Sequence, residues 1–328
     1  MKIFVYAMRE FDELPVAQQL AREIGVEFAY STAHPTMETI ELARGCEAVS
    51  CTPCPLTDEM MEKFAEVGVK YFLTRSIGYD FVDLKKVKAL GMRLSNVSYP
   101  PEGVANYAIM MILMSLRRMP YIMKTSDVQD FTLKGKIGKD ISGCTVGVIG
   151  TGRIGATVIR HLSGFGCRIL AYDLYPNEEV KKYAEYVTLD ELYAASDVIT
   201  LHAPATAQNY HTICDESIAK MKDGVCIVNT ARGQLIDTDA LIRGLYSRKI
   251  GSAALDVMEK ENGLYYFDRK ADLIDNTQMA VLRTMPNVIV SPHTAFYTEE
   301  VVACMLSCNF NSLKNYESGL ADPQEIKL

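Results

Sequence analysis

Four polar side chains follow the ends of apolar, strand-like runs in the second half of the chain. His202 follows the run DVITL, Arg232 follows CIVNTA, Asp256 follows SAAL and His293 follows VIVSP. In a parallel sheet, ligands bind outside the carboxyl ends of the strands, so we expect these side chains to meet at one edge. An imidazole can donate a proton near neutral pH, and a guanidinium is a permanent cation. His293 and Arg232 could therefore protonate and stabilise an oxygen that gains negative charge.

A carboxylate beside His293 would favour the protonated imidazole and orient its ring. The loop after Asp256 offers two candidates, Glu259 and Glu261, and spacing alone does not choose between them. Each residue also has a plain structural interpretation, because many strand-end histidines are structural and most glutamates in charged loops are simply solvated. The proposed chemistry therefore needs support from elsewhere in the chain.

The sequence GTGRIG at residues 150–155 follows the strand-like run TVGVI and precedes a helix-forming segment. Strand, glycine loop and helix in this order form the context of a dinucleotide-binding fingerprint. Gly150 permits the tight turn, Gly152 lets a pyrophosphate approach the backbone, and Gly155 lets helix and strand pack closely. The helix N-terminus then offers N–H groups and a positive dipole end to the phosphates.

Asp173 ends the next strand-like run, RILAYD. It lies about twenty residues beyond the glycines, where an acid accepts hydrogen bonds from the adenine ribose hydroxyls. A carboxylate at this position would repel a 2′-phosphate, so the sequence predicts NAD rather than NADP. Transfer of a hydride to a keto carbon puts negative charge on its oxygen, which is the charge that His293 and Arg232 could meet.

The elements around these residues predict an α/β protein with two doubly wound parallel-sheet, Rossmann-like domains and a cleft between them. Residues 1–99 and 297–328 form the expected substrate-binding domain, because the last helix, from Thr298, is too short to fold alone. Residues 100–296 form the expected NAD-binding domain. The apolar segment GVANYAIMMILMSLRRM, at 103–119, predicts a long buried helix between domains or subunits, and we expect a homodimer.

The composition excludes several classes of function. The chain has 34 Lys and Arg against 41 Asp and Glu, a net charge of -7 that disfavours nucleic acid as a partner. The longest apolar stretch, at 107–116, is too short to cross a membrane, and no signal peptide is recognised, so a cytoplasmic protein is expected. Cys51 and Cys54 form a C-x-x-C pair without a second pair or a suitably spaced histidine, so no metal site is predicted.

The whole chain resembles the D-isomer-specific 2-hydroxyacid dehydrogenase family, above all its D-lactate dehydrogenase branch, which includes enzymes associated with vancomycin resistance. The resemblance rests on the stretches TRSIGYDFVDL, LSNVSYPPEGVANYA, VGVIGTGRIG, VNTARGQLIDTDAL, AALDVMEKE and MPNVIVSPHTAFYTEE. It implies NAD-dependent reduction of a small 2-keto acid, such as pyruvate, phenylpyruvate or 2-ketoisocaproate, to the D-2-hydroxy acid.

The resemblance also assigns roles to residues. It implies that Arg232, Glu261 and His293 are catalytic, with His293 as proton donor, and that Ile77 and Gly78 bind the substrate carboxylate through their N–H groups. The expected substrate contacts are Ile77, Gly78, Tyr99, Arg232 and Tyr297. The expected cofactor contacts are Gly150, Gly152, Arg153, Ile154, Gly155, Asp173, His202, Pro204, Thr230 and Asp256.

Other functions in related families stay open at this point. A formate dehydrogenase is disfavoured, because those relatives place Gln where this chain has Glu261. An enzyme resembling phosphoglycerate dehydrogenase fits less well but is not excluded. An NAD-sensing, corepressor-like scaffold would keep the same fold and the same polar residues, and a turnover assay would separate it from an enzyme.

Overall fold

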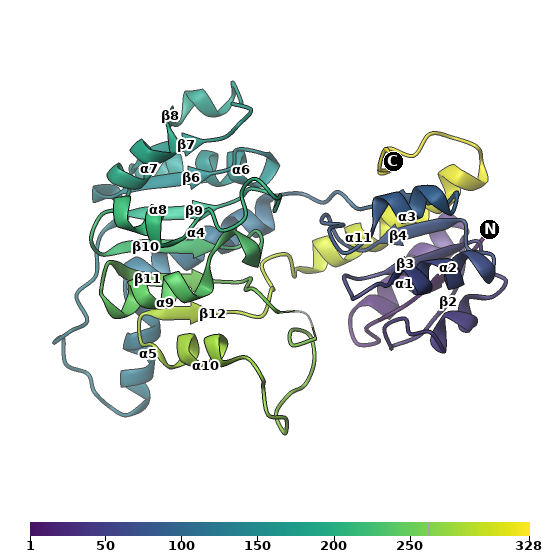
Figure 1. Ribbon diagram of the computed structural model, residues 1–328, viewed down its shortest axis with the longest axis horizontal. Helices are drawn as coiled ribbons and strands as arrows, with labels where there is room; N and C mark the ends of the chain where they lie inside the picture. Colours follow the sequence, from purple (N-terminus) through teal and green to yellow (C-terminus); the bar gives the residue numbers. More distant parts are fainter. Residues whose placement is uncertain (262) are drawn as a thin grey trace. The chain divides into compact units, whose positions relative to one another are not determined.

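The computed structural model describes residues 1–261 and 263–328. The chain divides into two compact units, called unit 1 (Met1–Pro100 with Tyr297–Leu328) and unit 2 (Pro101–Phe296). Each unit contains one parallel β-sheet flanked by helices (Figure 1). The predicted α/β class with two doubly wound parallel sheets is therefore confirmed.

Unit 1 is built on a sheet with the strand order β2-β1-β3-β4-β5. Its strands are β1 (Lys2–Val5), β2 (Glu27–Tyr30), β3 (Ala48–Cys51), β4 (Tyr71–Thr74) and β5 (Arg93–Ser95). Its helices are α1 (Glu13–Ile24), α2 (Asp58–Glu66), α3 (Leu84–Ala89) and α11 (Glu299–Glu317), with a 3-10 turn at Thr39–Ala43. Although α11 lies at the end of the chain, it packs on α1 and β4. The strand order changes direction between β1 and β3, where ligands bind in doubly wound sheets.

Unit 2 is built on a sheet with the strand order β12-β11-β10-β9-β6-β7-β8. Its strands are β6 (Thr145–Ile149), β7 (Arg168–Tyr172), β8 (Glu185–Tyr186), β9 (Val198–Leu201), β10 (Val225–Asn229), β11 (Ile250–Leu255) and β12 (Val288–Val290). Its helices are α4 (Glu102–Leu116), α5 (Met119–Asp127), α6 (Arg153–Leu162), α7 (Leu189–Ala195), α8 (Asp215–Lys220), α9 (Thr238–Tyr246) and α10 (Thr277–Thr284), with short 3-10 turns at Ile141–Gly143, Ser163–Phe165, Val180–Lys182 and Gly233–Leu235. The strand order changes direction between β6 and β9, which places the fingerprint loop at the switch point.

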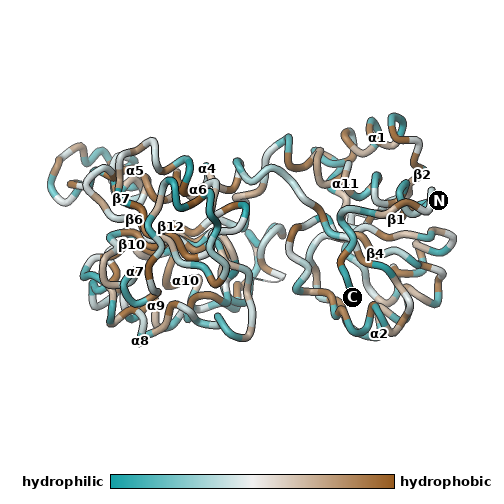
Figure 2. The backbone as a smooth tube through the Cα atoms, turned by 90° about the horizontal axis from the view of Figure 1, so that it is seen from above, coloured by the Kyte–Doolittle hydropathy of each residue, from teal (hydrophilic) through white to brown (hydrophobic). Residues whose placement is uncertain are grey.

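The central strands of unit 2 are apolar and buried along their whole length. Every residue of β9 and β10 is buried, and the hydropathy colouring shows β6, β10 and β12 as a brown interior (Figure 2). Strands of a parallel sheet covered on both faces have this continuous apolar character. The described helices include none long and apolar enough to cross a membrane.

Helix α4 is buried, as the sequence analysis expected, and packs within unit 2; its expected place between domains or subunits stays a prediction. It packs on α6, β10 and β11, and Ala105, Ala108, Met111 and Ile112 are fully buried there. The apolar residues cover most of the helix circumference because α4 is enclosed by a sheet on one side and a helix on another.

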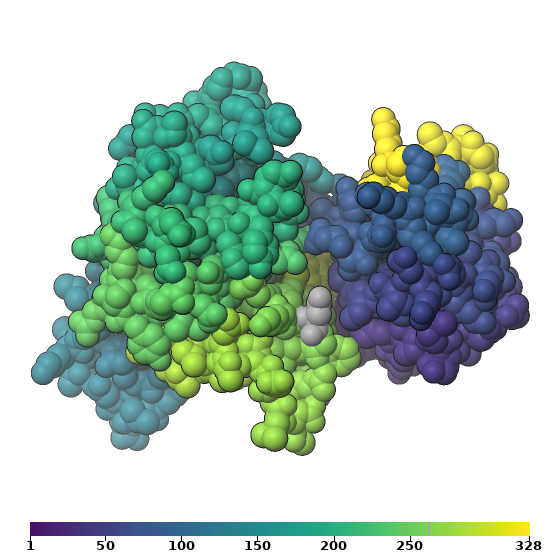
Figure 3. All heavy atoms as spheres, viewed as in Figure 1, coloured from purple at the N-terminus to yellow at the C-terminus, as the bar shows by residue number. Residues whose placement is uncertain are grey.

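One run of exposed apolar side chains lies just after α4. We call α5 together with the residues up to Ile137 the arm, and α5 itself has no buried residue. The arm stands out from the rest of unit 2 in the ribbon and space-filling views (Figures 1 and 3). Its exposed apolar side chains are Met123, Val128, Phe131, Leu133 and Ile137.

Candidate active site

The fingerprint loop of unit 2 has the geometry that its glycines require. Gly150 adopts φ 95°, and a Cβ there would lie 2.6 Å from the backbone nitrogen of Ala203. A Cβ on Gly155 would lie 1.9 Å from the carbonyl oxygen of Gly150, so only glycine lets α6 approach β6 this closely. Gly152 has open space around its Cβ position and begins α6 without a side-chain cap. A phosphate can therefore approach the N–H groups at the start of α6.

Asp173 is fixed beside the fingerprint loop at the end of β7. Its Oδ2 accepts hydrogen bonds from the backbone nitrogen of Thr151, at 2.5 Å, and from the Thr151 hydroxyl, at 3.1 Å. Its Oδ1 accepts from the backbone nitrogen of Tyr175 at 2.9 Å. The predicted ribose ligand is thus held in place by the glycine loop itself.

Three further predicted cofactor contacts follow β9 and β10. Nε2 of His202 lies 2.9 Å from the Thr200 hydroxyl, and desolvation lowers the pKa of His202 to about 3, so its ring is neutral. Pro204 lies two residues further along the same loop. The buried Thr230 hydroxyl finds no hydrogen-bond partner within residues 1–261 and 263–328. An unsatisfied buried hydroxyl at this edge fits a bound polar ligand such as a dinucleotide.

Asp256 follows β11 and fixes the turn that carries His293. Its Oδ1 accepts from the Ser291 hydroxyl at 2.6 Å and from the backbone nitrogen of Thr294 at 2.9 Å. Its Oδ2 accepts from the backbone nitrogen of Ala295 at 2.8 Å, and its carbonyl oxygen accepts from the backbone nitrogen of His293 at 2.8 Å. The carboxylate is fully buried. Its cofactor contact stays a prediction, because the oxygens already bind this turn.

His293 and Glu261 form a half-exposed pair at the carboxyl ends of β11 and β12. Nδ1 of His293 lies 2.7 Å from Oε1 of Glu261, and the two side chains are 29% and 21% exposed. Oε2 of Glu261 accepts from the backbone nitrogen of Met258 at 2.8 Å. His293 itself adopts φ 53°, a left-handed conformation that non-glycine residues adopt only rarely. A carboxylate on Nδ1 orients the ring and leaves Nε2 to face a ligand.

Arg232 follows β10 and starts the 3-10 turn at Gly233–Leu235. One guanidinium nitrogen donates to the Ala231 carbonyl at 2.8 Å, and the Asn229 side chain donates to the Arg232 carbonyl at 2.8 Å. A half-buried guanidinium in a braced turn is suited to bind a carboxylate or an oxyanion.

Two aromatic residues that the sequence did not assign to catalysis surround His293. The Tyr266 hydroxyl donates to the His293 carbonyl at 2.8 Å. The rings of Tyr266 and Phe296 lie 6.2 and 6.3 Å from the imidazole, centroid to centroid. Nothing in the sequence signalled the hydrogen bond from Tyr266 to His293.

In unit 1, Ile77 and Gly78 lie in the loop after β4. The Ser76 carbonyl accepts from the Thr74 hydroxyl at 3.0 Å, the Ile77 carbonyl accepts from the Asn96 side chain at 2.8 Å, and the Gly78 carbonyl accepts from the Ser76 hydroxyl at 2.6 Å. Because a peptide group is planar, a fixed carbonyl also fixes the N–H of the next residue. The N–H groups of Ile77 and Gly78 are therefore oriented by Thr74 and Asn96.

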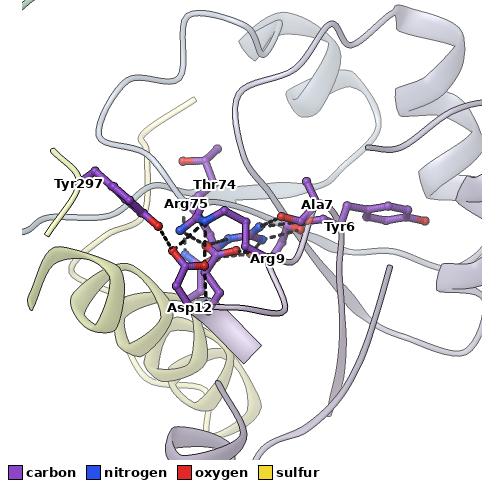
Figure 4. A network of polar contacts seen from close by, with 10 residues as sticks. Tyr6, Ala7, Arg9, Asp12, Thr74, Arg75 and Tyr297 are labelled. Carbon is purple, nitrogen blue, oxygen red and sulfur yellow. Dashed lines mark hydrogen bonds and ion pairs between the residues drawn. The ribbon is translucent and has the colours of Figure 1, made fainter. Parts of the chain in front are cut away.

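A buried arginine that the sequence analysis missed, Arg75, comes directly before this loop and lies in a network of polar contacts (Figure 4). Nε of Arg75 donates to Glu13 at 3.2 Å, and Nη1 donates to the Ser50 hydroxyl at 3.0 Å. Nη2 donates to the carbonyls of Tyr6 and Ala7 at 2.8 and 3.0 Å. Arg75 thus joins the carboxyl ends of β1, β3 and β4.

Tyr297, a predicted substrate contact, belongs to the same network. Its hydroxyl donates to Asp12, and the Arg9 guanidinium lies 5.3 Å from the centre of its ring. Nε of Arg9 donates to both carboxylate oxygens of Asp12 at 3.0 Å. Tyr99, the other predicted aromatic contact in unit 1, is buried at 8% exposure.

Cys51 and Cys54 lie at the end of β3 and in the loop that follows. Burial raises the pKa of the Cys54 thiol to about 12 and that of Cys51 well above its ordinary value. Neither thiol is therefore a ready nucleophile or ligand. Within the described residues, no group of acidic, histidine or cysteine side chains is arranged to hold a metal ion.

Comparison with known proteins adds to this geometry. A family model described as "D-isomer specific 2-hydroxyacid dehydrogenase, NAD binding domain" matches residues 109–295. An aromatic 2-oxoacid reductase of Clostridium sporogenes is 40% identical over 327 residues, covering 97% of this chain and 96% of the relative.

Two further similarities span the chain. A D-lactate dehydrogenase of Lactiplantibacillus plantarum is 41% identical over 329 residues, covering 99% of each chain. The crystal structure of a D-lactate dehydrogenase from Treponema pallidum superposes with a TM-score of 0.89 at 35% identity and covers 100% of both chains.

Proposed function

The chain belongs to the D-isomer-specific 2-hydroxyacid dehydrogenase family, and from this premise we propose that it reduces a small 2-keto acid to the D-2-hydroxy acid with NADH. The observation that carries the proposal is the His293–Glu261 pair, with Nδ1 and Oε1 2.7 Å apart, in the same unit as the fingerprint loop. The family match and the full-length similarity to a D-lactate dehydrogenase support it.

In the proposed reaction, NADH supplies the hydride that reduces C2 of the keto acid. His293 gives a proton to the keto oxygen, and Glu261 stabilises the imidazolium before transfer and orients the ring. Arg232 binds the carboxylate and balances the charge that develops on oxygen. Asp256 acts indirectly, through the turn that carries His293.

For the cofactor, we propose that the N–H groups at the start of α6, including those of Arg153 and Ile154, bind the pyrophosphate. Asp173 would accept hydrogen bonds from the ribose. His202, Pro204 and the Thr230 hydroxyl would line the rest of the dinucleotide site. The open space at Gly152 and the unsatisfied Thr230 hydroxyl support this assignment.

For the substrate, we propose that the N–H groups of Ile77 and Gly78 bind the carboxylate and that Tyr99 and Tyr297 contact the rest of the molecule. Tyr266 and Phe296, which flank His293, favour an apolar side chain on the keto acid. The similarity to an aromatic 2-oxoacid reductase supports an aromatic or branched substrate as well as pyruvate.

The test is NADH oxidation with pyruvate, phenylpyruvate, 2-ketoisocaproate, 3-phosphohydroxypyruvate and glyoxylate, each repeated with NADPH. Rapid turnover of one aliphatic or aromatic keto acid with NADH, giving a D product on chiral chromatography, is the expected result. Binding of NADH without turnover of any acid would support a sensor instead. Preference for 3-phosphohydroxypyruvate would support the phosphoglycerate dehydrogenase alternative.

We also propose that the enzyme works as a homodimer in the cytoplasm. Phe131, Leu133 and Ile137 of the arm are 76%, 88% and 84% exposed, and a second copy that covers them would remove this apolar surface from water. The nine cysteines are all in the thiol form, as expected in a reducing compartment. Sedimentation should give a dimer, and replacing Phe131 and Leu133 with serine should give a monomer. A monomeric wild-type protein would contradict the proposal.

A further inference from the structure

Two histidine–glutamate pairs lie in unit 2, and their glutamates are separated by a single residue. Glu261 pairs with His293, as described above. Glu259 pairs with His211, whose Nε2 lies 2.8 Å from Oε1 of Glu259. His211 comes from the loop before α8, and no role has been assigned to the second pair so far.

Glu259 is anchored on both of its carboxylate oxygens. Besides the bond to His211, its Oε2 accepts from the backbone nitrogen of Thr238 at 3.1 Å and from the Thr238 hydroxyl at 2.7 Å. Thr238 is the first residue of α9 and is 4% exposed. Burial raises the pKa of Glu259, but the hydrogen bonds from His211 and Thr238 outweigh it, and the pKa lies below its ordinary value. The side chain is therefore ionised at neutral pH.

Lys260, between the two glutamates, adopts the left-handed conformation at φ 59°. This conformation is unfavourable for an L-residue. It persists only where the flanking contacts determine it. Here the flanking contacts are those of Glu259 on one side and those of Glu261 with His293 and Met258 on the other.

His211 is tied by its backbone to the segment that follows Arg232. Its N–H donates to the Gln234 carbonyl at 2.9 Å, and two residues later the Ile213 N–H donates to the Leu235 carbonyl at 2.9 Å. This segment in turn touches the Glu259 loop, because a Cβ on Gly233 would lie 2.1 Å from the Met258 carbonyl carbon. The loop that carries His211, the segment that follows Arg232 and the loop that carries Glu259 thus pack against one another.

We propose that His211 and Glu259 are positioning residues, which hold the loop carrying Glu261 against the segment carrying Arg232. The inference rests on the proposed function, because it assigns the pair to the same reaction. Neither residue contacts His293. The pair acts on the position of Glu261 through the left-handed turn at Lys260. This turn lets Glu259 contact His211 while Glu261 contacts His293.

Loss of the His211–Glu259 bond would let Lys260 relax toward an ordinary conformation and move Oε1 of Glu261 away from His293. The charged and titratable groups around His293 are the Glu261 carboxylate, the Tyr266 hydroxyl on its carbonyl, and the Asp256 carboxylate on its turn. Those around His211 are Glu259 and Asp237, the latter 4.0 Å from Nδ1. Of the groups around His293, Glu261 is the one that the variant is expected to displace.

The experiment compares the variant H211F with H161F in the full-length protein. Phenylalanine keeps a ring that can stack on Tyr210, as His211 does with centroids 3.8 Å apart, but it cannot donate to Glu259. His161, on α6, is the matched control, because its one side-chain hydrogen bond within the described residues joins Nδ1 to the Asn106 side chain at 2.9 Å. The chain has only 5 histidines, so imidazole NMR can assign the His293 signals and compare them between variants without any turnover.

In H211F we expect the imidazole NMR signals of His293 to move from their wild-type positions, since its carboxylate partner has moved. We also expect kcat for keto-acid reduction to fall about 10-fold or more, with the KM for NADH within about twofold of wild type. H161F should match the wild type in both readouts. If H211F does not fold, E259Q provides the same test, because an uncharged amide weakens the bonds to His211 and Thr238.

Unmoved His293 signals in a folded H211F or E259Q protein would overturn the proposal, even if thermal stability fell, because the pair would then be merely structural. If the wild type turns over no keto acid, the proposed function fails, but the NMR comparison still decides whether the pair positions Glu261.

Discussion

The two units use buried charge in different ways. In unit 1, Arg75 and Glu13 form an ion pair with both side chains at 0% exposure, and Arg75 is surrounded by further acceptors. In unit 2, His293 and Glu261 are 29% and 21% exposed and sit beside a left-handed turn. A fully enclosed pair can only hold the backbone around it, whereas a half-exposed pair can exchange a proton with a ligand.

The comparison predicts that the main effect of replacing Arg75 is on the stability of the protein and not on catalysis. Arg75→Met removes the cation from the core and leaves Glu13 with Arg9 alone, at 3.2 Å. Breaking a buried pair by removing one partner should lower the free energy of unfolding by about 3 to 5 kcal/mol. Denaturant unfolding, followed by a probe in unit 1, measures this loss.

The control is Arg44→Met, which breaks the pair between Arg44 and Glu41, 61% and 42% exposed. An exposed pair contributes little to stability, because water and salt screen it, so Arg44→Met should unfold nearly as the wild type does. Similar losses in the two variants would contradict the distinction between enclosed and exposed charge in this protein.

Much of the fold was predictable because it rests on local patterns. Alternating apolar runs and the Gly150–Gly155 loop predicted the strands and the cofactor edge of unit 2. Strand β8 was missed, because two residues, Glu185 and Tyr186, carry no periodic signal. The break after α4 was also missed, although Pro120 at the start of α5 is a helix-start signal that could have revealed it.

The site was predictable only in part, for a physical reason. His293 and Arg232 follow strands, so topology alone places them at one edge. The separate partners of Glu259 and Glu261 depend on the left-handed backbone of Lys260. The residue type did not predict this conformation, because lysine rarely adopts it. Arg75 was missed because its partners come from β1, β3 and α1, which are distant in sequence.

His293→Ala is predicted to have the next largest effect, on rate rather than on stability. Removing the proposed proton donor should lower kcat for reduction at least about 100-fold, while the half-exposed position leaves the fold intact. Steady-state kinetics and thermal unfolding on the same sample give both numbers. If the variant keeps full activity, His293 is not the proton donor. If the variant loses as much stability as Arg75→Met, His293 is a structural residue like Arg75.

Glu261→Gln should have a smaller effect on rate than His293→Ala, because it leaves the proposed donor in place. Without the carboxylate charge, the imidazolium that precedes proton transfer is less stabilised. At neutral pH we expect kcat about 10-fold lower. Steady-state kinetics measured beside wild type check this, and an unchanged kcat would show that Glu261 does not support the donor.

Asp173 gives the smallest predicted effect and tests whether a fixed charge at the cofactor edge selects NAD. Asp173→Ala removes both the charge and the acceptor for the Thr151 backbone nitrogen, whereas Asp173→Asn can keep an acceptor and removes the charge. If the charge excludes a 2′-phosphate, both variants should narrow the preference for NADH over NADPH by about 10-fold. If the carboxylate only braces the glycine loop, Asp173→Ala should weaken both cofactors equally and Asp173→Asn should resemble wild type. The ratio of kcat/KM for NADH and NADPH in the two variants separates these roles, because only an electrostatic role changes the ratio.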